Sequence, residues 1–283
     1  MAINKKKFKG VGEYWGGTVC VYDCLLDWER TLAFKKAIFR AVRPGDVVID
    51  AGSGTGVLAM FASDAGAKSV YAIENDADIL RSLEKTLRLN GYQDKIQIIR
   101  DDAQRCRVAE KADVLISEII GSGLIEEDQI PVFNYLRRFL KPKAKVIPQR
   151  IDSFVDLVYS SRKHYKKDFF FPHYLDPKTH ISSFSNTVKY LSVQFDPKKK
   201  ISSIIQAKIK TKIRQEGEIN GLRITSKTFF PSGEIFTSST SYCPPLIFPL
   251  ESIHVKSGQI YKLKLNYRLS EGINNVKYCL EKS

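Results

Sequence analysis

The fold is decided by the stretch Val47-Val48-Ile49-Asp50-Ala51-Gly52-Ser53-Gly54-Thr55-Gly56. Its apolar start predicts a buried strand, and glycine at every second position predicts a tight turn before a helix that begins near Val57. A loop that cradles a pyrophosphate follows the pattern G-x-G-x-x-G, which would require glycine at position 57. The turn therefore favours close approach of the backbone to a ligand that lacks phosphates.

Short apolar segments alternate with longer helical segments on both sides of this turn. Apolar residues recur at helical spacing in residues 32–42, 57–65, 79–89 and about 130–140, and strands are expected at 47–49, 69–73, 96–99, 114–116 and 145–147. Helices between strands are typical of a parallel sheet covered by helices. The first half of the chain is therefore predicted to be an α/β domain.

After Pro148 the apolar period changes from that of a helix to that of a strand. Apolar and polar residues alternate in residues 205–213 and 261–269, and shorter alternations occur at 189–195 and 276–280. Lysine or arginine occupies many of the polar positions, which predicts strands with a cationic outer face. We expect an antiparallel β-barrel or sandwich, and hence two domains, at residues 1–147 with an N-terminal helical segment and at 148–283.

The composition is that of a globular protein. Of 283 residues, 43% are hydrophobic and 27% are charged, which excludes wholesale disorder. No apolar run reaches the roughly 18 residues of a membrane span, so we expect a cytoplasmic protein without membrane association. Five cysteines without a C-x-x-C pair, and four histidines without metal-ligand spacing, predict reduced thiols and no metal.

The net charge of +14 is unevenly distributed. Residues 1–150 hold 24 Lys and Arg against 20 Asp and Glu, and residues 151–283 hold 21 against 11. The resulting charges are +4 and +10, and a strongly cationic second half favours an acidic partner. Acidic protein, nucleic acid and an anionic metabolite all fit that description, although the chain contains no recognised RNA-binding motif.

Acidic residues follow the next two expected strands. Glu74 ends the strand after the glycine turn, where a carboxylate can accept both ribose hydroxyls of a nucleoside. Asp102 and Ala103 follow the third strand, where a carboxylate can accept from an adenine amine. Each feature alone also occurs as an ordinary turn or solvated loop, but their order at successive strand ends favours a cofactor site.

Residues 47–116 resemble the S-adenosylmethionine-binding core of the Rossmann-like methyltransferases. The stretch from Asp50 through Gly52, Gly54 and Gly56 to Ala62 is similar to that of the protein arginine methyltransferases, and the similarity extends to Ala65-Gly66-Ala67. The resemblance implies S-adenosyl-L-methionine as the cofactor. It also implies a Rossmann-like domain followed by a substrate-side β-barrel.

Two glutamates bracket a glycine-containing segment after the fourth expected strand. Glu118 and Glu127 can converge on one guanidinium, offset its charge and concentrate lone-pair density on one terminal nitrogen. The segment resembles the double-glutamate loop of the arginine methyltransferases, in which Glu126 is the neighbour of the second glutamate. A purely structural alternative is that Glu126, Glu127 and Asp128 charge the N-terminus of the following helix.

Residues 27–32 resemble the segment of the arginine methyltransferases in which an arginine pairs with the methionine carboxylate of the cofactor. The resemblance implies this role for Arg30. A solvated arginine at the start of a helix is the alternative. The family's Thr-His-Trp loop corresponds to Thr240-Ser241-Tyr242, so Ser241 stands where the family's histidine pairs with the aspartate that is Asp27 here.

The function predicted from these residues is methyl transfer to a guanidinium nitrogen of an arginine in a protein or peptide. Glu118 and Glu127 would orient the acceptor. The cofactor would be held by Arg30, Asp50, Gly52, Gly54, Gly56, Glu74, Asp102 and Ala103. The alternatives are a methyltransferase of a small molecule, a non-arginine peptide site or RNA, and a binding module without chemistry. The oligomeric state is left open.

Overall fold

The computed structural model describes residues 18–176, 178–239 and 241–283, so residues 1–17 of the expected N-terminal helical segment lie outside the described part. Its helices are α1 (Thr18–Leu26), α2 (Trp28–Ala41), α3 (Val57–Asp64), α4 (Ala77–Leu89) and α5 (Gln129–Leu136), with 3₁₀ turns at Ser122–Leu124, Arg137–Phe139 and Ile273–Asn275. None of the helices formed by the described residues has the length and apolar character needed to cross a membrane.

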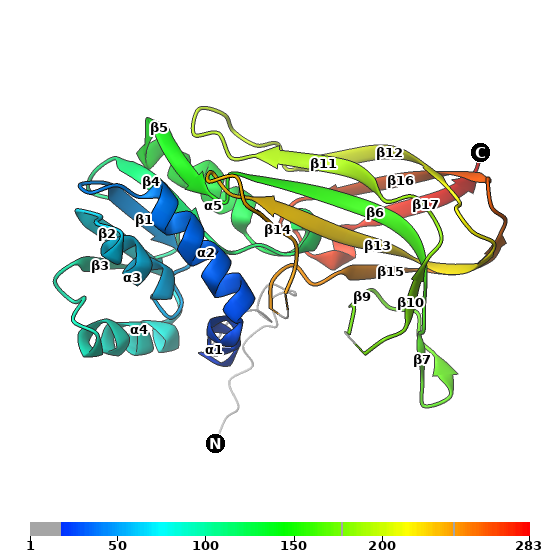
Figure 1. Cartoon of the computed structure of the whole chain (residues 1–283), viewed down its shortest axis with the longest axis horizontal. Coiled ribbons are helices and arrows are strands. Elements are labelled where there is room, and N and C mark those ends of the chain that lie inside the picture. The colour runs from blue at the N-terminus through cyan, green and yellow to red at the C-terminus, as the bar shows by residue number, and fades with distance from the viewer. Residues whose placement is uncertain (1–17, 177, 240) are drawn as a thin grey trace, which may run out of the picture.

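The first half of the chain forms a five-stranded parallel sheet. Its strands are β1 (Val47–Ala51), β2 (Ser69–Glu74), β3 (Ile96–Arg100), β4 (Ala112–Ser117) and β5 (Leu140–Ile147), in the order β3-β2-β1-β4-β5. All five residues of β1 are buried because it lies at the centre of the sheet. Helix α2 packs through Phe34, Ala37, Ile38 and Ala41, which share one helical face. The predicted α/β fold is confirmed (Figure 1).

One helix is shorter than expected. The spacing of apolar residues predicts a helix to about residue 140, but α5 ends at Leu136 and β5 begins at Leu140. The 3₁₀ turn Arg137–Phe139 lies between them, and Pro142 disfavours helical geometry only from Lys141 onward.

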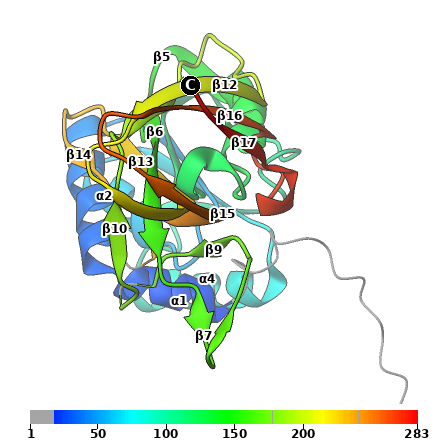
Figure 2. The ribbon, with the colours of Figure 1, turned by 90° about the vertical axis from the view of Figure 1, so that its right-hand side faces the viewer.

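The second half consists of antiparallel sheets. Seven strands form one sheet: β6 (Arg150–Ser160), β9 (His173–Tyr174), β10 (Ile181–Ser183), β11 (Val188–Gln194), β13 (Gly217–Phe229), β14 (Ile235–Phe236) and β15 (Leu246–Val255). Three form another: β12 (Ile204–Lys212), β16 (Ile260–Arg268) and β17 (Lys277–Lys282). A small hairpin joins β7 (Lys163–His164) and β8 (Lys167–Asp168). Figures 1 and 2 show β12, β16 and β17 lying over β6, β13 and β15.

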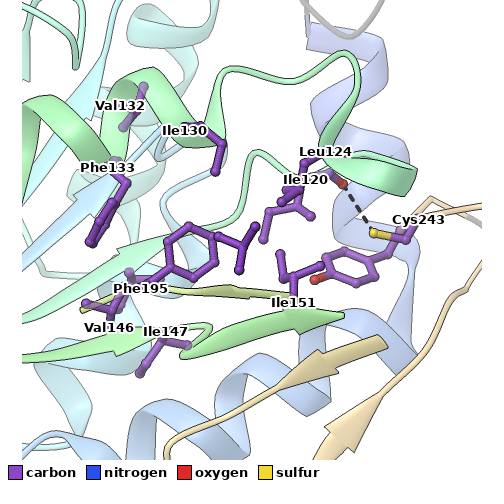
Figure 3. Packing of buried hydrophobic residues seen from close by; sticks show 14 of the residues in the cluster. Ile120, Leu124, Ile130, Val132, Phe133, Val146, Ile147, Ile151, Phe195 and Cys243 are labelled. Atoms are coloured by element: carbon purple, nitrogen blue, oxygen red, sulfur yellow. Dashed lines mark hydrogen bonds between the residues drawn. The ribbon is translucent and has the colours of Figure 1, made fainter. Parts of the chain in front are cut away.

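The two halves share one hydrophobic core. Phe133 of α5 and Phe195, which follows β11, meet edge to face with ring centroids 5.1 Å apart (Figure 3). Cys243 of the second half also contacts the first half, because its Sγ donates to the carbonyl oxygen of Ile120 at 3.6 Å (Figure 3). Since the parallel sheet ends at Ile147 and the antiparallel sheet begins at Arg150, we propose the domain boundary between residues 147 and 148.

Candidate functional site

A cavity of about 350 Å³ opens at the carboxyl ends of the parallel strands. The sheet order reverses direction between β1 and β4, and ligands of open α/β sheets bind at such a switch point. Segments that follow β1, β2, β3 and β4 line the cavity, and α1 contributes Cys20 and Cys24. Most of the predicted site residues line this one cavity: Arg30, Gly52, Gly54, Glu74, Asp102, Ala103, Glu118 and Glu127.

The glycine turn requires its first two glycines for backbone geometry. Gly52 and Gly54 have φ angles of 71° and 53°, which residues with a side chain rarely adopt. A Cβ on Gly52 would lie 2.9 Å from Cγ2 of Ile119, and one on Gly54 would lie 3.0 Å from Cγ1 of Val21. Both glycines therefore keep the backbone at the edge of the cavity open.

Asp50 and Gly56, both predicted to bind the cofactor, do not line the cavity. Gly56 caps α3 with a φ of 80°, and a Cβ there would lie 2.5 Å from Cδ1 of Leu83. This places its role in packing α4 against the turn. Asp50 is 1% exposed within β1, and burial raises its pKa to about 7.

Glu74 is fixed by three backbone donors. The N–H groups of Gly54, Asn75 and Asp76 donate to its carboxylate at 3.0, 2.9 and 3.0 Å. The end of β2 is thereby joined to the glycine turn after β1, and the carboxylate has a single orientation. Asp102 is held similarly, because its Oδ1 accepts from the Gln104 N–H at 2.8 Å.

Arg30 forms an ion pair with Glu118, and both side chains are nearly buried, at 12% and 10% exposure. Its Nη1 also donates to the carbonyl of Cys24 at 2.8 Å. Glu118 follows β4 directly, so this pair connects the start of α2 to the end of the strand. Arg30 Nε is buried without a partner among the described residues, which leaves one donor for a ligand carboxylate.

Ser241 contacts Asp27 in place of the histidine that the resemblance implies. Asp27 Oδ2 accepts from the N–H and the Oγ of Ser241 at 2.9 and 2.8 Å, and from Ser239 Oγ at 2.5 Å. Asp27 also caps α2 by accepting from the Arg30 N–H at 3.1 Å. The link between the antiparallel domain and the start of α2 is thus made by serines; Thr240 lies outside the described residues.

The segment that carries Glu127 is anchored by the antiparallel domain. The Tyr267 hydroxyl donates to the Gly123 carbonyl at 2.8 Å, and the Gly123 N–H donates to Ser226 Oγ at 3.0 Å. Ser270 Oγ donates to the carbonyl of Glu127 itself at 2.6 Å. These contacts come from residues about a hundred positions later in the chain, and no local pattern in the sequence indicates them.

Glu127 and its neighbour Glu126 both line the cavity. Burial first, and then the charges of Glu126 and Asp128, raise the pKa of Glu127 to about 7. Glu126 is only 5% exposed, accepts a hydrogen bond from the Tyr174 hydroxyl, and has a pKa that burial raises to about 7. Its Oε1 has no partner within the described part of the chain. Glu126, which the resemblance implies only as the neighbour of Glu127, is therefore a buried residue of the cavity, and no local pattern in the sequence indicates this burial.

Replacing Tyr267 with phenylalanine tests the anchor. The change leaves the buried Gly123 carbonyl without this donor, so we expect a loss of about 1–3 kcal/mol in unfolding free energy. The rate of the methyl transfer that the resemblance implies should fall while affinity for the implied cofactor stays within twofold, since Arg30, Glu74 and the glycine turn are untouched. Isothermal titration and single-turnover rates would measure this. Equal losses of affinity and rate would show a general defect instead.

No group of three or more His, Cys, Asp or Glu among the described residues could hold a metal ion. The cavity does fit a nucleoside cofactor. Its volume lies in the range of small-molecule sites, the glycine turn leaves the backbone accessible, and Glu74 and Arg30 Nε supply an oriented acceptor and a free donor.

Comparisons with known proteins agree with this geometry. The family model of ribosomal protein L11 methyltransferase (PrmA) matches residues 29–147. The uncharacterized protein MJ1452 of Methanocaldococcus jannaschii is 33% identical over 261 residues, 92% of this chain and 95% of that protein. Protein arginine N-methyltransferase 6 of Danio rerio is 35% identical over 136 residues, but these span only 47% of this chain and 39% of that protein.

Two solved structures share the fold over nearly the whole chain. The Trypanosoma brucei PRMT1 enzyme-prozyme complex with AdoHcy has a TM-score of 0.75 at 18% identity, and Arabidopsis thaliana protein arginine methyltransferase 10 has 0.77 at 16%. Each comparison covers 96% of this chain and 99% of the other.

The fold, the glycine turn at the switch point and these matches define the class. The chain is a class I S-adenosylmethionine-dependent methyltransferase that resembles the protein arginine methyltransferases. Within that class it belongs to the same family as MJ1452 of Methanocaldococcus jannaschii.

Proposed function

We propose that this methyltransferase acts on a guanidinium nitrogen of an arginine side chain in a protein or peptide. The observation that carries the proposal is that Glu118 and Glu127 line the same cavity as the glycine turn, although they come from opposite ends of a loop. The partial match to protein arginine N-methyltransferase 6 supports it.

The two carboxylates bind and orient the acceptor. Glu118, held by Arg30, and Glu127 accept N–H bonds from the guanidinium, offset its charge and direct one nitrogen toward the methyl group. When bound, S-adenosylmethionine supplies an electrophilic methyl group on its sulfonium and leaves as the neutral thioether. The nitrogen gains a bond to carbon and releases one proton, and a Glu127 carboxylate with a pKa near 7 is suited to accept it.

The cofactor is assigned to the other side of the cavity. We expect Glu74 to accept from the ribose hydroxyls, Asp102 from the adenine amine, and Arg30 Nε to donate to the methionine carboxylate. Gly52 and Gly54 allow the backbone to approach, and Ala103 lines the adenine end. Asp50 and Gly56 support the turn from beneath.

The charge of the cavity favours a cationic acceptor. Carboxylates from the ends of three strands (β2, β3 and β4) and from the Glu127 segment line it, whereas Arg30 is the one arginine in the lining and is already paired with Glu118. Strands β12 and β16 lie on the side of the molecule away from α1, which lines the cavity (Figures 1 and 2), so screening at physiological salt reduces the repulsion of a cationic tail by their lysines. The acidic partner predicted from the net charge is therefore assigned to that face.

The rate of methyl transfer should depend on pH through Glu127. Because its pKa is raised to about 7, the carboxyl group of Glu127 is increasingly neutral below pH 7. A neutral carboxyl carries a proton on one oxygen and has no charge to offset that of the guanidinium, so only the carboxylate binds the acceptor in this way. We expect kcat/KM to rise about tenfold per pH unit up to about pH 7 and then level off. Glu126→Gln removes a neighbouring negative charge and so lowers the pKa of Glu127. The rising part of the pH profile should therefore move to lower pH in this variant. An unchanged pH profile would contradict the assignment.

The acceptor is identified by product analysis. The protein is incubated with methyl-labelled cofactor and a lysate of its host, untreated or pretreated with protease or ribonuclease, and the labelled fraction is hydrolysed. Methylarginine in a protease-sensitive fraction is the expected result. Label that survives protease but is lost with ribonuclease, or that migrates as a small molecule, would establish the non-arginine alternative.

A further inference from the structure

The three-stranded sheet carries a continuous cationic face. Seven of its exposed side chains are basic: Lys208, Lys210, Lys212, Lys262, Lys264, Arg268 and Lys277. The opposite face is buried through residues such as Ile209, Leu263 and Leu265. The alternation expected from the sequence is thus present, and the structure brings the lysines of separate strands together.

The register sets like charges against each other. Lys208 lies opposite Lys264, and Lys210 lies opposite Lys262. Directly opposed like charges destabilise a sheet. Lys264 pairs with Glu281 at 2.8 Å and Arg268 with Glu271 at 3.7 Å, whereas the other five make no ion pair within the described ranges. Glu281 of β17 lies opposite Lys262 as well, so the opposed lysines of β12 and β16, and not the whole face, lower stability.

Protection of sheet edges does not explain this face. Lysines on an exposed edge strand prevent pairing with other chains, and β12 is such a strand. Lys262 and Lys264, however, belong to β16, which is already paired on both sides. Charges on a central strand have no edge to protect, so edge protection does not account for Lys262 and Lys264.

The chemistry of the face indicates its partner. Its exposed apolar side chains, Ile204 and Ile260, stand at its two ends, so the centre offers no apolar anchor of the kind that protein interfaces use. No aromatic side chain of the described strands points outward here, so unpaired bases have nothing to stack on. Cations repeat at about 7 Å, two residues apart, along β12 from Lys208 to Lys212 and between Lys262 and Lys264 of β16.

We propose that this cationic face binds the phosphate backbone of double-stranded nucleic acid without reading its sequence. A duplex keeps its bases stacked inside and presents about one negative charge per 1.7 Å of axis, so its charge is complementary to that of the array of ammonium groups. Both views place the face on the side of the molecule away from α1, which lines the cavity (Figures 1 and 2). The proposal does not depend on the identity of the methyl acceptor.

The test measures binding of fluorescein-labelled 20-base-pair duplexes, one of DNA and one of RNA, to the full chain at several salt concentrations. In Lys208→Gln/Lys210→Gln/Lys262→Gln we expect affinity at 50 mM salt to fall at least about tenfold, and the slope of log K against log salt to flatten by roughly 2–3. The matched control, Lys85→Gln/Arg88→Gln/Lys143→Gln, removes the same charge from exposed positions elsewhere and should stay within twofold.

Fold and location are checked separately. Lys210→Glu places a carboxylate opposite Lys262, so its melting temperature should equal or exceed that of the wild type while duplex binding weakens. A photo-crosslinker on Cys279, which is exposed opposite Lys264, should capture the duplex, and the adduct should disappear in Cys279→Ser.

Several results would overturn the proposal. These are equal loss of binding in the control variant, unchanged binding in the face variant, and tighter binding of a single strand than of the duplex. Displacement of the duplex by polyglutamate or by phosphatidylserine vesicles at lower charge concentration than unlabelled duplex would assign the face to an acidic protein or a membrane. A difference in affinity between the DNA duplex and the RNA duplex would show which of the two nucleic acids the face binds.

Discussion

Replacing Glu127 with glutamine is expected to reduce methyl transfer about 10²–10³-fold while cofactor affinity stays within threefold. Glutamine keeps the size of the side chain but presents one amide N–H₂ where the guanidinium needs an acceptor. Glu127 lines the cavity, and its backbone is fixed by Ser270, so the variant should keep its fold. Single-turnover rates and titration calorimetry would separate the two effects.

Asp128→Asn is the matched control for this experiment. Asp128 is the next carboxylate along the chain, also lines the cavity and is exposed. Its neutralisation should lower the rate less than threefold. Retained turnover in the Glu127 variant, or an equal loss in the Asp128 variant, would contradict the role of a double carboxylate and would favour a diffuse electrostatic effect.

Replacing Arg30 with alanine is expected to cost about 3–5 kcal/mol of unfolding free energy and to abolish detectable cofactor binding. The change leaves Glu118 as a nearly buried carboxylate without its partner, and it removes the hydrogen bond to the Cys24 carbonyl. Denaturant unfolding monitored by circular dichroism would measure the stability.

A double-mutant cycle distinguishes this ion pair from a general packing defect. Since Glu118→Gln removes the unpaired charge, Arg30→Ala/Glu118→Gln should regain about 2 kcal/mol of the loss. Cofactor binding should not return in the double variant, because the donor that we assign to the methionine carboxylate is still missing. Additive losses would show that Arg30 and Glu118 do not interact in solution.

Ser239 and Ser241 contact Asp27 where the resemblance to the protein arginine methyltransferases implies a histidine, so the connection between the antiparallel domain and the start of α2 is kept. Ser239 and Ser241 reach Asp27, which caps α2 and thereby positions Arg30. The same helix start then supports Glu118 through the ion pair. The substitution at position 241 therefore leaves the support of the cavity intact, and it does not by itself favour a different acceptor.

In the antiparallel half, strands that face solvent on one side could be predicted from the sequence, and strands buried on both sides could not. In β12 and β16 exposed and buried residues alternate, which produces the period of two that indicates a strand. In β6 every residue is buried or half-buried, because both faces of the strand are covered and not only the edges that pair with its neighbours. Its sequence therefore carries no such alternation.

The sequence by itself determined the parallel sheet, the glycine turn and the carboxylates at the strand ends, because each depends on residues close together in the chain. Only the tertiary structure decided that Arg30 pairs with Glu118, that Glu126 is buried beside Glu127, and that Tyr267, Ser226 and Ser270 hold their loop. These contacts join residues separated by about a hundred positions or by a domain boundary. Their partners are chosen by packing of the whole molecule, which no local pattern of residue types encodes.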